Sequence, residues 1–125
     1  MAEPVSVLIV DDQAPFRRAA RAVVTATAGF EVIGEAESGE EAVELAGALH
    51  PGLVLMDINL PGINGIEATR RITTADPSAV VMLLSTYQAA DLPDDSADCG
   101  AAAYVHKEQF GPDVVREVWA NHTSV

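Results

Sequence analysis

Short, almost unbroken apolar runs that end at polar residues constrain this chain more than any other feature. The first run is VSVLIV at 5–10, which two aspartates follow, and similar runs occupy 53–56, 80–84 and 101–105. Runs of this length are typical of strands that are buried on both faces of a parallel sheet. A weaker, alternating run at 30–36 predicts a fifth strand near the edge of that sheet.

Segments with helical spacing separate these runs. Ser38 followed by Glu41 matches a capping box, in which the hydroxyl and the carboxylate each accept a hydrogen bond from a free backbone N–H group. Further helices are expected to begin near Asn64 and at Pro112, whereas a proline and four aspartates predict only a short or irregular helix in 88–98. The apolar residues expected on the buried helix faces are Phe16, Ala19, Ala20 and Val23; Ala42, Val43, Leu45 and Ala46; Ile66 and Ile72; and Val114, Val115, Val118 and Trp119.

Alternation of five strands with helices predicts an α/β fold. With right-handed crossovers, this pattern gives a flavodoxin-like, doubly wound parallel sheet of order 2-1-3-4-5 with helices on both faces. The 125 residues and the 49% hydrophobic content suit one domain, residues 1–125, with a continuous core.

Polar residues gather where the predicted strands end. In this topology, ligands bind at the carboxyl edge of the sheet, beside the point where the winding reverses. The residues expected there are Asp11 and Asp12 after the first strand, Asp57 after the third, Ser85 and Thr86 after the fourth, and Lys107 after the fifth.

The three carboxylates predict a metal-assisted site. Two such charges repel by about 4 kcal/mol at 4 Å in a medium of effective dielectric constant near 20. Mg²⁺, which binds a few carboxylate and carbonyl oxygens together with waters and phosphate oxygens, would neutralise them, and Lys107 would add a fixed positive charge. A carboxylate in such a setting can attack phosphorus and form an aspartyl phosphate. Asp11 or Asp12 taken alone could instead simply cap the helix that follows.

Four segments together resemble the receiver domains of bacterial two-component response regulators. They are DD at 11–12, MDINLPGINGIEATRRI at 56–72, LSTY at 84–87 and YVHK at 104–107. LSTY and GIEATRRI are most similar to the branch whose members carry LuxR-type helix-turn-helix outputs. The resemblance implies a phosphorelay protein that takes a phosphoryl group from a sensor histidine kinase and controls transcription. It also allows for a homodimer that forms on activation.

The resemblance also implies a role for each site residue. Asp57 would be the phosphoacceptor and, with Asp12 and the backbone carbonyl of Asn59, would bind Mg²⁺ directly, while Asp11 would assist through water. Lys107 would pair with the phosphoryl group. No catalytic turnover is implied beyond slow loss of that group.

Two further positions would report phosphorylation to the rest of the domain. Ser85 matches the switch hydroxyl and Thr86 its neighbour in the phosphate environment, while Tyr104 matches an aromatic switch residue, although a static, half-buried tyrosine would fit the sequence equally well. The chain departs from the family at Ala103, where glycine is common, and at His106, where an apolar residue is usual.

Composition limits the compartment and the partners. A formal charge of −12 would repel a nucleic-acid backbone, so this domain alone is not expected to bind DNA. The sequence has no signal-peptide pattern or membrane span, and its single cysteine, Cys99, suits a reducing cytoplasm.

Other functions fit the residues less well. A flavin phosphate would be repelled by Asp11 and Asp12, an aspartyl phosphatase would need an acid where Asn59 stands, and a calcium-binding EF-hand loop is disrupted at Pro61 and Ala68. A pseudo-receiver that acts by protein binding alone, without phosphorylation, remains the alternative.

Overall fold

The computed structural model describes residues 3–86 and 99–123, so the helix expected in 88–98 lies outside the described residues. Five parallel strands form one sheet of order β2-β1-β3-β4-β5, which confirms the predicted α/β fold. No helix in this part of the chain is long and apolar enough to cross a membrane. In chain order the elements are β1 (Val5–Val10), α1 (Ala14–Ala26), β2 (Phe30–Ala36), α2 (Gly39–Leu49), β3 (Leu53–Asp57), α3 (Gly65–Ala75), β4 (Val80–Ser85), β5 (Ala103–His106), the 3₁₀ helix η3 (Lys107–Gln109) and α4 (Pro112–Thr123).

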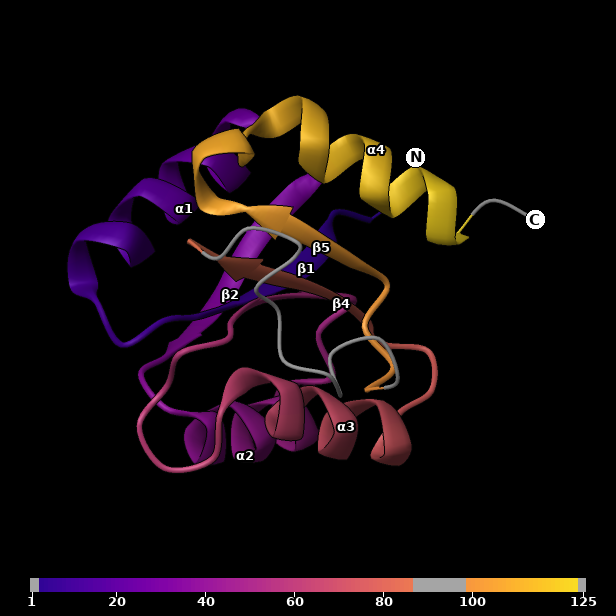
Figure 1. Cartoon of the computed structure of the whole chain (residues 1–125). Coiled ribbons are helices and arrows are strands. Elements are labelled where there is room, and N and C mark those ends of the chain that lie inside the picture. The colour runs from indigo at the N-terminus through magenta and orange to yellow at the C-terminus, as the bar shows by residue number, and fades with distance from the viewer. Residues whose placement is uncertain (1–2, 87–98, 124–125) are drawn as a thin grey trace.

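The sheet lies between two layers of helices, with α1 and α4 on one face and α2 and α3 on the other (Figure 1). Successive residues of β1 point to opposite layers. Leu8 and Val10 belong to the core cluster beneath α2 and α3, whereas Val7 and Ile9 belong to the cluster beneath α1 and α4. Burial on both faces explains why this strand lacks the polar alternation of a one-sided sheet.

Side chains cap α2 and α3 at the predicted positions. Ser38 Oγ accepts a hydrogen bond from the Glu41 N–H at 3.1 Å, and Asn64 Oδ1 accepts one from the Glu67 N–H at 2.9 Å. The capping box is only half formed, because the Glu41 carboxylate accepts from the N–H of Glu37, at 2.7 Å, instead of that of Ser38. A long glutamate side chain has more than one free N–H group within reach at a helix start.

The last strand is shifted along the chain relative to the predicted run 101–105. β5 begins at Ala103 and ends at His106. The residue before it, Ala102, already donates a hydrogen bond to the Val81 carbonyl at 2.8 Å, so the chain joins the sheet before regular pairing starts. The shift places His106 at the end of the strand.

The helices bury most of the faces predicted for them. In α1 the prediction is wrong for Ala19, which is exposed. The residues most deeply buried are Ala20 and Val24, with Phe16 partly buried, because residues four apart share one helix face. In α4, Val118 is buried, and Trp119 is partly buried against the core of its layer.

Candidate functional site

Residues distant in sequence meet at the carboxyl edge of the sheet. Asp11 directly follows β1, Asp57 ends β3, and Lys107 directly follows β5. β1 and β3 are neighbours at the centre of the sheet, at the point where the winding reverses. The predicted convergence of these three residues is confirmed by the ion pairs between them.

Three carboxylates cluster at this edge, and two of them pair with one ammonium group. Asp11, Asp12 and Asp57 each offer an oxygen within 4.8 Å of the others. Asp11 is completely buried, Asp57 is 5% exposed, and Asp12 is exposed. Lys107 Nζ lies 2.7 Å from Asp11 Oδ2 and 3.6 Å from Asp57 Oδ1. Three carboxylates outnumber the single ammonium group, so the cluster keeps an excess of negative charge, and the exposed Asp12 lies on its solvent side.

The electrostatic surroundings of Asp57 favour its protonated form. Burial, and then the negative charge of Asp11, raise the pKa of the Asp57 carboxyl from 3.8 to about 6, against the opposing effects of the Lys107 charge and a hydrogen bond from the Asn59 N–H. Asp12 adds a smaller upward contribution. A bound cation would act in the opposite direction, because positive charge stabilises the carboxylate.

Asp11 also organises the turn at the end of β1. Its Oδ1 accepts a hydrogen bond from the Gln13 N–H at 2.8 Å, while its Oδ2 bonds Lys107. Gln13 is the N-cap of α1 and makes no side-chain cap of its own. Neither Asp11 nor Asp12 is therefore the cap of α1, because Asp11 bonds the N–H of the N-cap residue itself and not an N–H group within the first turn of the helix.

Arg17 braces the same turn from α1. Its Nη1 donates to the backbone carbonyl of Asp11 at 2.6 Å, and its other guanidinium nitrogens pair with Glu35 and Glu37, both at 3.2 Å. The sequence did not single out Arg17, because arginines are common on helix surfaces. Its ion-pair partners are also distant from it in sequence: Glu35 lies in β2 and Glu37 follows that strand.

Phe16 lies beneath the Lys107 ammonium. The Nζ atom is 4.3 Å from the centroid of the Phe16 ring, which in turn lies 6.1 Å from the Phe110 ring. A cation over an aromatic face is stabilised by the ring quadrupole. Helical spacing marked Phe16 only as a core residue, since the contact to Lys107 depends on how α1 packs beside the turn that follows β5.

Gly65 allows α3 to begin directly against the end of β3. A Cβ atom at this position would overlap the backbone carbonyl oxygen of Asp57. The Gly65 N–H donates to the Ile58 carbonyl at 2.8 Å, and the Ile58 N–H donates to the Leu84 carbonyl at 3.2 Å. Only glycine fits this close approach of two backbones, which fixes where the Asp57 side chain starts.

A polar pocket, here called the acidic pocket, opens at this edge. It is lined by Asp12, Gln13, Asp57, Asn59, Thr86 and Lys107. Of the two hydroxyl candidates, the exposed Thr86 is in the lining, whereas Ser85 is 1% exposed at the end of β4. Tyr104 is half-buried against the core cluster beneath α2 and α3. The switch roles of Ser85 and Tyr104 stay predictions.

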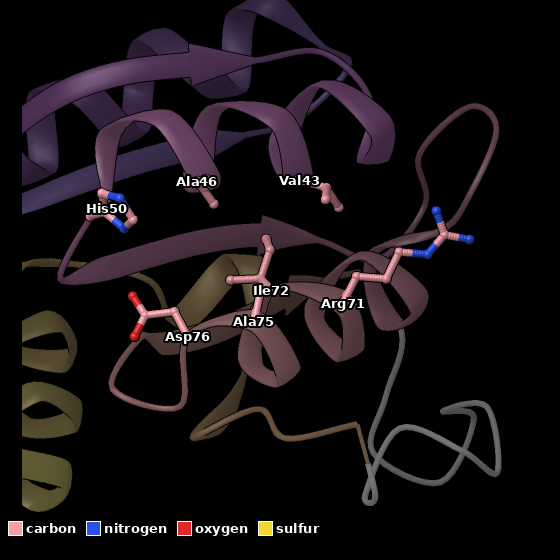
Figure 2. Close-up of a pocket in the computed structure, with 8 residues that line it drawn as sticks. Val43, Ala46, His50, Arg71, Ile72, Ala75 and Asp76 are labelled. Atoms are coloured by element: carbon pink, nitrogen blue, oxygen red, sulfur yellow. The ribbon is translucent and has the colours of Figure 1, made fainter.

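A second hollow, here called the α2–α3 groove, lies away from the acidic pocket. Ile72 of α3 points toward α2, while the Arg71 side chain extends outward (Figure 2), where its Nε pairs with Glu67 at 2.9 Å. The groove is lined by Val43, Ala46, Gly47, His50, Arg71, Ile72, Ala75 and Asp76.

Comparisons with known proteins agree with this geometry. The transcriptional regulatory protein LnrK of Bacillus subtilis (strain 168) is 34% identical over 119 residues, which are 95% of this chain and 54% of LnrK. The chain thus spans about half the length of LnrK and of other transcriptional regulators that it matches, and about 27–31% of the matched protein-glutamate methylesterases.

Two solved structures have the same fold. A LuxR-family two-component response regulator from Aurantimonas sp. SI85-9A1 superposes with a TM-score of 0.85 at 30% identity, over 96% of this chain and 86% of that one. A chain of the CheX–CheY–BeF₃–Mg²⁺ complex from Borrelia burgdorferi superposes with a TM-score of 0.83 at 28% identity, over 95% and 89%.

The family assignment rests on almost the whole chain. The model of the response regulator receiver domain matches residues 7–118, which include Asp11, Asp57 and Lys107. The LuxR-family neighbour agrees with the branch that the sequence resembles. This chain belongs to the response regulator receiver domain family.

Proposed function

We propose that the chain is the phosphoacceptor receiver of a two-component phosphorelay, in which Asp57 takes a phosphoryl group from the phosphohistidine of a sensor histidine kinase. The observation that carries this proposal is the cluster of Asp11, Asp12 and Asp57, two of which, Asp11 and Asp57, pair with the Lys107 ammonium, beside a polar pocket. Family membership supports it. The receiver is a stoichiometric acceptor with, at most, slow self-dephosphorylation, and its output is control of transcription, as the name of LnrK suggests.

The donor set fits Mg²⁺. Asp12, Asp57 and Asn59 line the acidic pocket, and Asp11 offers an oxygen within 4.8 Å of those of Asp12 and Asp57. Asp12, Asp57 and the backbone carbonyl of Asn59 would hold the ion directly, and Asp11 would assist through water. Carboxylate and carbonyl oxygens with open positions for waters and phosphate are the ligands that Mg²⁺ takes. When bound, the ion supplies positive charge that neutralises the carboxylates and the transferring phosphoryl group.

The chain's own residues carry the transfer. A carboxylate oxygen of Asp57 attacks phosphorus and forms the P–O bond, while the P–N bond breaks and its electron pair returns to the leaving imidazole of the kinase. Lys107 Nζ, 3.6 Å from Asp57 Oδ1, donates to a phosphoryl oxygen. A hydroxyl from Ser85, or from Thr86 at the pocket wall, donates to the transferred group and so biases the ends of β4 and β5 toward a second arrangement.

Intact mass spectrometry tests the proposal. Incubation with acetyl phosphate and Mg²⁺ should add one phosphoryl group to the wild-type chain, and both chelation of the metal and Asp57→Asn should abolish the adduct. Stoichiometric labelling of Asp57→Asn would place the acceptor elsewhere. No adduct on the folded, Mg²⁺-loaded wild type would leave the pseudo-receiver as the function.

A further inference from the structure

His106 connects two segments that line the acidic pocket. It ends β5 and directly precedes Lys107. Its Nε2 lies 3.0 Å from the carbonyl oxygen of Thr86, and its Nδ1 lies 3.1 Å from the backbone nitrogen of Glu108. Thr86 and Lys107 are both pocket residues. One imidazole ring therefore bridges the carboxyl ends of β4 and β5.

The two contacts determine the tautomer of the ring. The Glu108 backbone N–H can only donate, so His106 Nδ1 must present a lone pair. The Thr86 carbonyl can only accept, so Nε2 must carry the hydrogen. Both bonds form together only when the ring is neutral and protonated on Nε2, as in other sites where a hydrogen bond at one nitrogen sets the state of the other.

The ring also caps the turn that carries Lys107. His106 is the N-cap of η3, whose first residue is Lys107, and its Nδ1 takes the place of a capping oxygen. Within the turn, the Phe110 N–H bonds the Lys107 carbonyl only at 3.3 Å. The sheet holds the backbone of His106 opposite Ser85, but a three-residue 3₁₀ helix has few bonds of its own. The His106 cap therefore adds a constraint on the backbone from which the flexible lysine side chain begins.

We propose that His106 is a positioning residue for phosphoryl transfer. It sets the backbone of Lys107 relative to that of Thr86, so that the ammonium and the end of β4 reach the same phosphoryl group on Asp57. This inference rests on the proposed function of Asp57. An apolar residue at this position would fill similar space but make neither hydrogen bond.

Three variants separate the nitrogens of His106 from its bulk. His106→Phe keeps a ring without either nitrogen, His106→Ala removes both ring and nitrogens, and His106→Asn restores an oxygen that can accept from the Glu108 N–H. We expect His106→Phe and His106→Ala to slow labelling by acetyl phosphate by about tenfold, and His106→Asn to recover most of that loss, because Asn is a favoured N-cap. His122→Ala, on the exposed end of α4, is the matched histidine control and should label at the wild-type rate.

Rates are compared for the fraction of each variant that is folded by circular dichroism, so that loss of stability alone does not count. Labelling of His106→Phe at the wild-type rate would overturn the inference, since the ring nitrogens would then have no role. The inference would also be overturned if His106→Asn were labelled as slowly as His106→Ala. The capping bond to the Glu108 N–H would then not be what positions Lys107.

Nitrogen NMR of the wild-type chain gives a second, independent readout. Long-range ¹H–¹⁵N spectra above neutral pH should show the His106 ring in the Nε2–H tautomer, and the Nδ1–H tautomer would contradict the bridge. If the wild-type chain takes no phosphoryl group at all, the proposed function fails and takes this role with it. If only the variants and the tautomer disagree with expectation, the inference fails alone.

Discussion

The acidic pocket and the α2–α3 groove are built in opposite ways. The pocket collects charged side chains from the ends of strands that are far apart in sequence, such as Asp12 and Lys107. The groove lies between two helices on one side of the sheet and is formed largely by small and apolar side chains such as Ala46, Ile72 and Ala75 (Figure 2). The groove follows from packing small residues, whereas the pocket holds like charges together at an electrostatic cost. Chemistry and stability should therefore respond to different substitutions in the two regions.

Among the substitutions that leave the acceptor Asp57 in place, removal of the pocket's ammonium should slow labelling the most. Lys107→Met leaves the buried Asp11 unpaired and removes the group that would donate to the phosphoryl oxygen. We expect labelling by acetyl phosphate to slow by about 100-fold, as for other losses of a single charge-stabilising donor. Mass spectrometry over time measures the rate. Arg116→Met, which removes an exposed cation on α4, should leave it unchanged, and an equal loss in both variants would mean that overall charge, not position, controls labelling.

A substitution in the α2–α3 groove should lower the stability of the fold and leave the labelling rate unchanged. Ile72 is 3% exposed, and Ile72→Ala removes buried apolar contacts between α2 and α3. We expect the free energy of unfolding to fall by about 3 kcal/mol, the typical cost of such a truncation. Urea denaturation measures this change, while the labelling rate of the folded fraction should stay at the wild-type value. A large loss of labelling in folded Ile72→Ala would couple the groove to the pocket.

The stability of the fold should depend on pH through Asp57 in the acidic pocket. The folded-state pKa of Asp57 is raised from 3.8 to about 6, so the folded chain holds this proton more tightly than the unfolded chain. The resulting stabilisation is fully present below pH 3.8 and is lost as the pH rises through about 6. Asp57→Asn cannot ionise and should be more stable than the wild type near neutral pH by up to about 3 kcal/mol, at about 1.4 kcal/mol per pKa unit.

Denaturation of wild type and Asp57→Asn across this pH range, without metal, measures the difference. The two stabilities should converge toward acid pH, and Mg²⁺ should reduce the difference near neutral pH. The exposed Asp113→Asn is the control and should follow the wild type. A difference between wild type and Asp57→Asn that did not change with pH would show that ionisation of Asp57 is not its cause.

The smallest effect should come from the aromatic support of the lysine. Phe16→Leu keeps an apolar side chain but removes the ring that faces Lys107 Nζ. Since such contacts contribute about 0.5–1 kcal/mol, we expect labelling to slow by about threefold. Phe30→Leu makes the same chemical change against Trp119, on a ring that Lys107 does not contact. Equal rates in the two variants would assign the Phe16 effect to packing.

The sequence by itself determined the sheet and the identity of the acid cluster. An apolar run such as 5–10 can only be stable when it is buried on both faces, and strands that alternate with helices are parallel, so their polar ends share one edge. The order of the apolar runs was therefore enough to place Asp11, Asp57 and Lys107 together. The caps at Ser38 and Asn64 were equally predictable, because helix capping depends on residues three positions apart.

Only the tertiary structure decided how those charges are supported. Phe16 contacts Lys107, and His106 bonds Thr86, across separations in sequence that no local pattern encodes. The one-residue extension of β5 to His106 and the tight approach of Gly65 to Asp57 depend on how two backbones meet. The raised pKa of Asp57 likewise requires burial and a neighbouring charge, which exist only once the chain has folded.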